Sequence, residues 1–306
     1  MIEGHRSQLE REGSNRSDIS SNTRDPIGVI GLGLLGGSLA GRLDEHGYTV
    51  YGYDKNAASP GRVDFLESAK AVFEKCPTVI FSLPESSDVA EVLQGVDDVL
   101  IPKHHTVVDT TTGDPDEMRR FYELLKRRDI EYIEANVAGS SEAAKAGDAP
   151  LFLGGDALAI GKRKDLFDAM SETSFRMGDA GAASKFKLVH NLLLGLNRAV
   201  LAETLEFGEA LGFDKRLTLD VLKQTPASSY VMVTKGERMV QSDFQSPQAR
   251  LSQHLKDVCL ILAHAEQSGA QTPLSETHYR LLKELESLGY GECDNSAIVA
   301  AYRSSD

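Results

Sequence analysis

The stretch Ile30-Gly31-Leu32-Gly33-Leu34-Leu35-Gly36 places three glycines in the pattern G-x-G-x-x-G. It follows an apolar run typical of a buried strand and opens a helical segment, Leu34–His46, within a unit of about 30 residues. In a dinucleotide-binding turn Gly31 permits the tight turn, Gly33 lets the backbone approach a pyrophosphate, and Gly36 lets helix and strand pack closely. The pyrophosphate is then expected at the helix N-terminus, where N–H groups are free. A glycine-rich turn of another α/β protein is the alternative.

The acidic residue Asp54 lies 21 residues after Gly33, at the end of the second expected strand. A carboxylate there accepts hydrogen bonds from the adenine ribose of NAD and repels the 2′-phosphate of NADP. The neighbouring Lys55 weakens that repulsion. We therefore expect NAD as the cofactor, with NADP less favoured. The expected cofactor site in this part of the chain comprises Gly31, Leu32, Gly33, Leu34, Leu35, Gly36 and Asp54.

The composition of the 306-residue chain is that of an ordinary globular protein, with 41% hydrophobic residues and a net charge of −13. The negative charge, without a basic stripe, argues against nucleic acid or an anionic membrane as a partner. The longest apolar run, around Leu188–Leu196, is too short for a membrane span. Three scattered cysteines (Cys76, Cys259 and Cys293) suit free thiols in the cytoplasm. The eight histidines lack metal-ligand spacing, so no metal is expected.

The polarity and the predicted secondary structure of the sequence change twice along the chain. Residues 1–25 are polar and lack a signal-peptide core, which predicts a disordered tail. Residues 26–181 alternate β-rich runs with helical segments, which predicts an α/β Rossmann domain whose parallel sheet is covered on both faces. The expected strands are Ile27–Leu32, Thr49–Tyr53, Thr78–Leu83, Thr106–Asp109, Tyr132–Ala135 and Leu151–Leu153.

Residues 182–306 are predicted to form an all-helical domain for substrate binding and oligomerisation. A long helix near Ala182–Leu211 is expected to join it to the Rossmann domain. Three prolines stand at helix starts or breaks. The other expected helices are Lys215–Lys223, Ser228–Met239, Gln248–Ser268, Pro273–Leu288 and Asn295–Ala301.

Two dehydrogenase families share features with this chain. The run from Gly31 to Ala40 by itself resembles prephenate dehydrogenases. From Ile27 to Tyr302, however, the chain resembles the β-hydroxyacid dehydrogenase family, typified by 3-hydroxyisobutyrate dehydrogenase and tartronate semialdehyde reductase. That resemblance rests on four further blocks in the family's order. In addition, Ser82-Leu83-Pro84 matches a strand-end turn of the family, which implies that Leu83 and Pro84 border the cofactor.

The first two blocks imply a site for the substrate. Asp109-Thr110-Thr111-Thr112-Gly113-Asp114-Pro115 resembles D-x-S-T-x-x-P, although a helix N-cap also explains it. Glu134-Ala135-Asn136-Val137-Ala138-Gly139-Ser140 resembles D-A-P-V-S-G-G, a loop that holds the substrate carboxylate through backbone amides. Here Asn136, Ala138 and Ser140 replace proline, serine and glycine. The implied substrate-binding residues are Thr111, Thr112, Ala138, Gly139 and Ser140.

The third block contains the candidate catalytic pair. It matches the family pattern of a glycine, here Gly178, a lysine nine residues later and an asparagine four beyond the lysine. On a helix Lys187 and Asn191 project from one face. The resemblance implies that Lys187 transfers the alcohol proton, as an amine of lowered pKa can, and that Asn191 orients the substrate. Lys185 competes for the role, and a solvated surface lysine is the plain alternative.

The fourth block opens with Leu255-Lys256-Asp257 and closes with a segment from Gly289 to Ile298, similar to the family's K-D-L and G-x-G-x-x-D-x-S-A. By resemblance, Lys256 lies where nicotinamide and substrate meet; a solvated Lys–Asp pair is the alternative. The family implies a 6-phosphogluconate dehydrogenase-like C-terminal domain, and a homodimer or homotetramer.

Together these blocks predict an NAD-dependent oxidoreductase that interconverts a short 3-hydroxy acid and its semialdehyde or 3-oxo acid. The site is expected between the domains, at the carboxyl ends of the strands. A prephenate-type dehydrogenase, an imine reductase and a non-catalytic NAD-binding module remain as alternatives.

Overall fold

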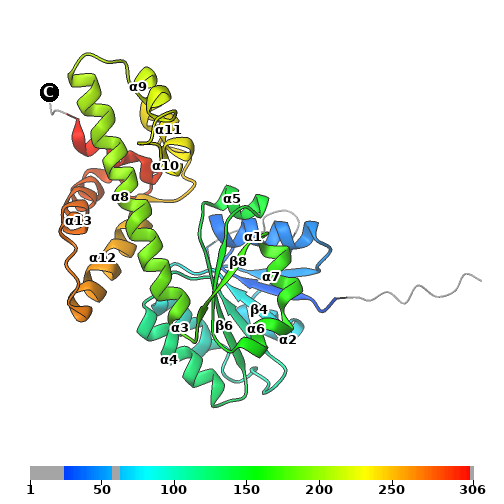
Figure 1. The fold of residues 1–306 in the computed structure, drawn as a ribbon. Helices are drawn as coiled ribbons and strands as arrows, with labels where there is room; N and C mark the ends of the chain where they lie inside the picture. The colour runs from blue at the N-terminus through cyan, green and yellow to red at the C-terminus, as the bar shows by residue number, and fades with distance from the viewer. Residues whose placement is uncertain (1–23, 57–62, 304–306) are drawn as a thin grey trace, which may run out of the picture.

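The computed structural model describes residues 24–56 and 63–303, and Figure 1 shows a sheet-containing part and a helical part joined by one long helix. The expectation of a disordered tail over residues 1–25 lies almost wholly outside the described residues. Among the helices of the described chain, none has both the length and the apolar character that a membrane crossing requires.

The sheet has eight strands in the order β3-β2-β1-β4-β5-β6-β7-β8. Strands β1 to β6 run parallel, β7 runs antiparallel to β6, and β8 runs parallel to β7. Their bounds are β1 Ile27–Ile30, β2 Val50–Tyr53, β3 Asp64–Phe65, β4 Thr78–Phe81, β5 Thr106–Asp109, β6 Glu131–Val137, β7 Leu151–Gly154 and β8 Ser174–Gly178.

The six expected strands all form, but the expectation of a wholly parallel sheet is wrong at β7. Strand β7 is buried on both faces and apolar, so its sequence looks like that of a parallel strand. Strands β3 and β8 are absent from the expected set. Both are largely exposed and so lack the continuous apolar run that marks a buried strand.

Helices cover both faces of the sheet because its strands present apolar side chains to both sides. In β1, for example, Ile27 and Val29 belong to one core and Ile30 to the other. One core lies beneath α1, α5, α6 and α7, and the other beneath α2, α3 and α4. The bounds are α1 Leu34–Glu45, α2 Ala69–Lys75, α3 Ser86–Gly95, α4 Pro115–Lys126, α5 Ser141–Ala146, α6 Ala157–Lys162 and α7 Lys164–Met170.

The remaining elements pack around a third core. They are α8 Ala182–Ala210, α9 Lys215–Leu222, α10 Tyr230–Thr234, α11 Gly236–Gln241, α12 Leu251–Ser268, α13 Pro273–Leu285, the π-helical turn η1 Glu286–Tyr290 and the 3₁₀ helix η2 Asn295–Tyr302. The single helix expected over 228–239 is therefore two helices. Lys235 separates them with a non-helical backbone, and its Nζ lies 2.8 Å from the buried Asp294 carboxylate.

Helix α8 contacts both parts of the molecule. Its beginning packs on β6, β7 and β8, and its later turns pack on helices and on η2 (Figure 1). The buried Glu134 of β6 fixes that beginning: its carboxylate accepts hydrogen bonds from the Gly181 N–H at 2.6 Å and from the Ser184 hydroxyl. Burial raises the pKa of Glu134. The domain boundary between residues 181 and 182 stays a prediction.

Candidate active site

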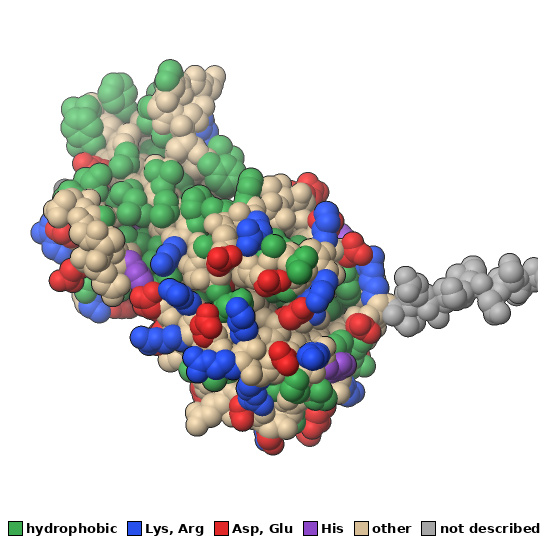
Figure 2. All heavy atoms as spheres, turned by 60° about the horizontal axis from the view of Figure 1, so that its bottom comes forward, with side chains coloured by type: hydrophobic (Ala, Val, Ile, Leu, Met, Phe, Trp, Pro, Cys, Tyr) green, Lys and Arg blue, Asp and Glu red, His purple; other side chains and the backbone are tan. Residues whose placement is uncertain are grey.

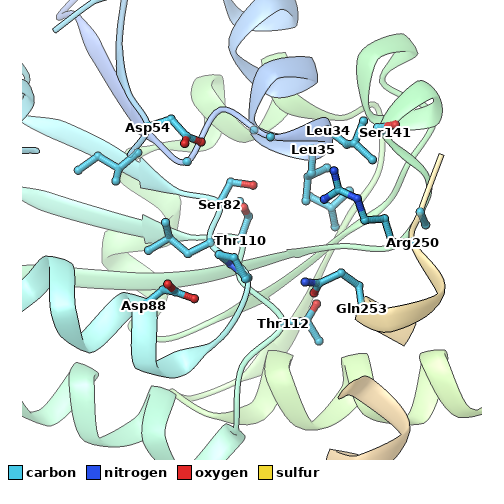
Figure 3. A pocket seen from close by; sticks show the side chains of 18 of the residues that line it. Leu34, Leu35, Asp54, Ser82, Asp88, Thr110, Thr112, Ser141, Arg250 and Gln253 are labelled. Carbon is cyan, nitrogen blue, oxygen red and sulfur yellow. The ribbon is translucent and has the colours of Figure 1, made fainter. Parts of the chain in front are cut away.

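A cavity of about 650 Å³ lies between the carboxyl ends of the parallel strands and the helical part. One wall consists of the glycine-rich turn and the segments that follow β2, β4, β5 and β6, and the other consists of α8 and α12. Figure 3 shows residues from both walls, with Asp54 at one end and Arg250 beside Ser141 at the other. An open α/β sheet places ligands at this edge.

The geometry of the glycine-rich turn fits a pyrophosphate. Gly31 has a φ of +91°, a backbone conformation that favours glycine. A Cβ on Gly36 would lie 1.9 Å from the Gly31 carbonyl oxygen, so only glycine allows α1 to approach the turn this closely. Gly33 lines the cavity and precedes α1 without capping it by a side chain, and a Cβ there would point into open space. A phosphate at this place would meet helix N–H groups and the positive end of the helix dipole.

Asp54 lies beside this turn, where its Oδ2 accepts a hydrogen bond from the Leu32 N–H at 2.7 Å. The side chain of Leu32 itself belongs to the core and does not line the cavity. The Lys55 ammonium is 3.0 Å from the Asp88 carboxylate and 3.4 Å from that of Glu91. The positive charge that could attract a 2′-phosphate is thus already balanced by two carboxylates.

The segments after β4 and β5 meet at the cavity. Leu83, Pro84 and Thr112 line it, as does Thr110, which the sequence did not single out. Thr111 does not line it: this residue is buried, and its Oγ1 accepts a hydrogen bond from the Leu83 N–H at 3.1 Å. Thr111 therefore holds the two segments together.

The loop after β6 presents Gly139 to the cavity, but Ala138 and Ser140 do not line it. The Ser140 hydroxyl instead caps α5, accepting a hydrogen bond from the Ala143 N–H at 3.2 Å. The adjacent Ser141 lines the cavity in its place. An N-cap role was invisible in the sequence because two consecutive serines offer the same hydroxyl group.

The unusual Asn136 is buried and does not line the cavity. Its Nδ2 donates a hydrogen bond to the Thr111 carbonyl oxygen at 2.8 Å. The substitution of asparagine for the family's proline therefore fastens β6 to the segment after β5.

Lys187 is buried and lines the cavity, whereas Lys185 is exposed. The Lys187 Nζ donates a hydrogen bond to the Val137 carbonyl oxygen at 2.6 Å. Burial lowers the pKa of Lys187 to about 8; the charge of Asp257 opposes this shift, and those of Lys256 and Arg198 add to it. An amine of this kind can exist in both protonation states near neutral pH.

Asn191 lies one turn beyond Lys187 and lines the same cavity. Its Nδ2 donates a hydrogen bond to Asp257 Oδ2 at 2.8 Å, and its Oδ1 lies 3.0 Å from His190 Nδ1. These contacts fix the orientation of the amide in the cavity.

Lys256 of α12 connects the two walls. Its Nζ donates hydrogen bonds to the carbonyl oxygens of Pro84, at 3.0 Å, and Thr112, and it lies 3.2 Å from the carboxylate of the neighbouring Asp257. The structure thus brings Lys187, Asn191 and Lys256 to one cavity with the glycine-rich turn.

Sequence reasoning did not find Arg198, Arg250 or Gln253, all of which line the cavity. Helical spacing carried a signal for two of them. Arg198 lies eleven residues, about three turns, after Lys187, and Gln253 lies one turn before Asp257. Arg250 immediately precedes α12 and forms an ion pair with Glu292 at 3.0 Å.

Comparison with known families assigns both parts of the chain. Residues 26–178, half of the chain, match the NAD binding domain of 6-phosphogluconate dehydrogenase. Residues 181–302 match the NAD-binding domain of NADP-dependent 3-hydroxyisobutyrate dehydrogenase. These matches cover the glycine-rich turn, Lys187 and Lys256.

Curated relatives extend over nearly the whole chain. The 2-(hydroxymethyl)glutarate dehydrogenase of Eubacterium barkeri is 29% identical over 90% of this chain and 94% of its own length. The 2-hydroxy-3-oxopropionate reductase of Escherichia coli is 28% identical over 90% of this chain and 96% of its own. The mouse cytokine-like nuclear factor N-PAC is 26% identical over 92% of this chain, but over only 51% of its own length.

Solved structures show the same fold. A 3-hydroxyisobutyrate dehydrogenase from Salmonella typhimurium superposes with a TM-score of 0.83 at 22% identity, covering 90% of this chain and 99% of that one. An imine reductase from Pseudomonas superposes with a TM-score of 0.62 at 18% identity, covering 92% and 100%. The two family matches, together with the hydroxy acid relatives, show that the chain belongs to the β-hydroxyacid dehydrogenase family and is a hydroxy acid oxidoreductase that uses a nicotinamide dinucleotide.

Proposed function

We propose that the chain interconverts a short 3-hydroxy acid of the 3-hydroxyisobutyrate type with its semialdehyde or 3-oxo acid, using NAD, with Lys187 as general acid and base. The observation that carries this proposal is the buried Lys187 amine in the cavity that also contains the glycine-rich turn. Each of the two bacterial relatives is named after a compound that carries an oxygen on C3, counting a carboxylate carbon as C1. These names support the proposed substrate class.

The cofactor would lie along the sheet edge, with its pyrophosphate on the turn at Gly31–Gly36 and its adenosine ribose at Asp54. When bound, it supplies the hydride acceptor for oxidation or the hydride donor for reduction. Leu83 and Pro84 border the path between the turn and Lys187. We propose NAD because the Asp54 carboxylate faces this end of the cavity and Lys55 is paired with Asp88.

During oxidation, the neutral Lys187 amine accepts the proton of the substrate hydroxyl as hydride leaves the carbon. During reduction, the Lys187 ammonium returns a proton to the carbonyl oxygen. The hydrogen bond to Val137 holds the nitrogen in place in both directions. Asn191 has a second amide hydrogen with which it can donate to the substrate oxygen, because Asp257 accepts only one.

The carboxylate of the substrate would lie against Gly139, Ser141 and Thr112, which line the same cavity. Gly139 can supply a backbone amide, while Ser141 and Thr112 supply hydroxyl groups. Thr111, Ala138 and Ser140 act indirectly in this arrangement, because they shape the loops without lining the cavity. Closure of the two walls would exclude water from the reacting atoms.

Two other functions fit the fold less well. An imine reductase would not require the buried Lys187 and Asn191 as a pair, and the imine reductase structures superpose less closely than the 3-hydroxyisobutyrate dehydrogenases do. A non-catalytic NAD-binding module is the other alternative, since the name of the relative N-PAC is that of a nuclear factor and not of an enzyme. Such a module would have no need to keep the Lys187 ammonium desolvated, an arrangement that costs free energy.

We also propose that the chain is a cytoplasmic homodimer or homotetramer. Five exposed apolar residues, four in α8 and one at its C-cap, lie within about 40° of one another around the helix axis, as their spacing requires. They are Val189, Leu193, Val200, Phe207 and Leu211. Figure 2 shows hydrophobic side chains gathered over the helical part, while charged side chains cover the sheet-containing part. A continuous apolar stripe of this length suits a second copy of the chain.

The test of the proposed reaction is a panel of acids with NAD and of aldehydes with NADH. 3-Hydroxyisobutyrate, glycerate, threonate, 4-hydroxybutyrate and 2-(hydroxymethyl)glutarate, with their carbonyl partners, would be assayed by NADH absorbance. We expect turnover of the 3-hydroxy acids and little turnover of 4-hydroxybutyrate, whose hydroxyl lies one carbon further from the carboxylate. Absence of turnover across the whole panel would contradict the proposed function.

A further inference from the structure

Arg198 is a second buried cation on the catalytic face of α8. It is 4% exposed and lines the cavity that contains Lys187. Eleven residues separate the two, which corresponds to three helical turns and about 16 Å between Cα atoms. The two charges nevertheless act on each other, because the charge of Arg198 helps to lower the pKa of Lys187.

Within the described part of the chain, Arg198 makes no hydrogen bond and no ion pair within 4.0 Å. The two carboxylates whose charges act on Arg198, those of Asp294 and Asp257, interact with other side chains. Asp294 is 2.8 Å from Lys235 Nζ, and Asp257 is 3.2 Å from Lys256 Nζ while also accepting from Asn191. A buried guanidinium without a partner is costly, so it is expected to meet an anion when the site is filled.

Besides these two carboxylates, the cavity wall near Arg198 carries two polar, neutral side chains. His254 and Asn295 line the same cavity, and His254 Nε2 and Asn295 Oδ1 are buried without a hydrogen-bond partner among the described residues. Burial lowers the pKa of His254 well below its usual value, so the ring is uncharged. Gly195 makes this arrangement possible, because a Cβ there would lie 2.5 Å from His254 Nε2.

Unpaired polar atoms thus surround one unpaired positive charge at the helical end of the cavity. A planar guanidinium binds a planar carboxylate through two parallel hydrogen bonds. The other end of the substrate is already assigned: Lys187 faces the reacting hydroxyl, and Gly139, Ser141 and Thr112 face the first carboxylate. The space beside Arg198 is therefore left for a tail of a few carbon atoms that ends in an acidic group.

On the basis of the proposed function, we infer that the preferred substrate is a dicarboxylic 3-hydroxy acid, and that Arg198 binds its second carboxylate. Arg198 is then a specificity-determining residue and takes no part in proton or hydride transfer. His254 and Asn295 complete the pocket around the tail.

The first experiment compares two acids that differ only in this group, 2-(hydroxymethyl)glutarate and 2-(hydroxymethyl)pentanoate. We expect kcat/KM to favour the dicarboxylate by at least about 10²-fold, because a substrate that leaves buried polar groups unpaired is rejected by up to about 10⁴–10⁵-fold. In Arg198→Met this preference should fall to within a few-fold of unity, and Arg198→Lys should keep part of it. Arg216→Met, which removes an exposed arginine paired with Glu237, is the matched control and should keep the wild-type preference.

The second experiment measures binding without turnover, by titrating glutarate and pentanoate into the complex of the enzyme with NADH. Wild type should bind glutarate at least about tenfold more tightly than pentanoate, a difference of about 1.4 kcal/mol. Arg198→Met, or Arg198→Gln should the methionine variant fail to fold, should abolish that difference.

The two experiments separate the inference from the function on which it rests. Equal use of both hydroxy acids by wild type, or an unchanged preference in Arg198→Met, would overturn the role of Arg198 and leave the dehydrogenase function intact. Absence of turnover with these two acids and across the panel of 3-hydroxy acids would overturn the proposed function, and the glutarate titration would then still decide whether Arg198 binds a carboxylate.

Discussion

Lys187 is the residue on which the proposed chemistry depends. Replacing it by methionine keeps the length of the side chain and removes the proton-transferring group. We expect Lys187→Met to bind NADH as wild type does and to lose about 10²–10⁴ in kcat, the usual contribution of a general acid or base. Fluorescence titration with NADH and steady-state kinetics measure the two quantities. Lys185→Met, two residues away and exposed, is the control and should keep its activity. Near-wild-type turnover of Lys187→Met would contradict the assignment.

The pH dependence follows from the pKa of Lys187, which burial lowers to about 8. Oxidation requires the neutral amine, so kcat/KM for the hydroxy acid should rise as the pH increases through about 8 and then level off. Reduction requires the ammonium, so its rate should fall over the same interval. Both limbs should be missing from the residual activity of Lys187→Met. Oxidation and reduction that respond in the same direction would exclude a single proton-transferring lysine.

Asp54 is the residue on which the proposed preference for NAD rests. In Asp54→Ser the carboxylate that repels a 2′-phosphate is gone, so the ratio of kcat/KM with NAD to that with NADP should fall by about tenfold or more. Asp88→Asn, which weakens the pairing of Lys55 and leaves Asp54 in place, should shift the ratio less. A wild-type enzyme that prefers NADP would refute this interpretation of Asp54.

That the glycine-rich turn, Lys187 and Lys256 lie at one cavity could be predicted, because their spacing along the chain matches the family pattern. Spacing does not tell which of several neighbouring hydroxyls or amides faces a cavity. Thus the hydroxyl groups of Thr111 and Ser140 accept hydrogen bonds from backbone N–H groups, while Thr110 and Ser141 line the cavity. Arg198 escaped notice because a single arginine in a helix is usually a solvated surface residue.

At the scale of elements, the junction between β1 and α1 tolerates no side chain at Gly36. A Cβ there would lie 1.9 Å from the Gly31 carbonyl oxygen, so Gly36→Ala must separate the helix from the turn. We expect NAD binding to weaken by about 10²-fold or more and the free energy of unfolding to fall by about 1–3 kcal/mol. Calorimetric titration and thermal unfolding measure these changes.

Gly41→Ala is the matched control, because it lies in the same helix and its Cβ would meet nothing within 4 Å. Alanine has the higher helix propensity, so this variant should gain about 0.5–1 kcal/mol and bind NAD as wild type does. Equal effects of the two substitutions would show that helix propensity, and not the close approach at Gly36, determines the outcome.

The type and order of most elements were predictable, because apolar runs and helical periodicity are local signals. Strand direction is not local: β7 has the composition of a parallel strand, yet pairs antiparallel with β6. The break between α10 and α11 also has a distant cause, since Lys235 reaches Asp294 across the helical part. Partners that lie far apart in the sequence leave no periodic signature.

At the scale of the whole molecule, the stripe along α8 predicts association of two copies. We expect light scattering after gel filtration to give at least twice the mass of one chain. The double variant Val200→Glu/Phe207→Glu should yield monomers. Both side chains are exposed in a single copy, so the charges leave its fold intact, but they would be buried without a partner in an interface between copies. Leu124→Glu on α4 removes another exposed apolar residue, outside the stripe, and should leave the mass unchanged. A monomeric wild type at micromolar concentration would contradict the prediction.

The reversed direction of β7 has a consequence for how accurately Lys187 is aimed. Because β8 runs parallel to β7, it ends at the edge of the sheet opposite the cavity, and α8 must travel back along β6 before it reaches the site. Along this path, Glu134 of β6 accepts a hydrogen bond from the residue that precedes α8. Val137, at the end of β6, accepts one from Lys187. A slip of the helix by one residue would rotate it by about 100° and turn the lysine out of the cleft. The direction of one four-residue strand thus determines that the helix carrying Lys187 runs along β6, where Glu134 and Val137 fix its rotation.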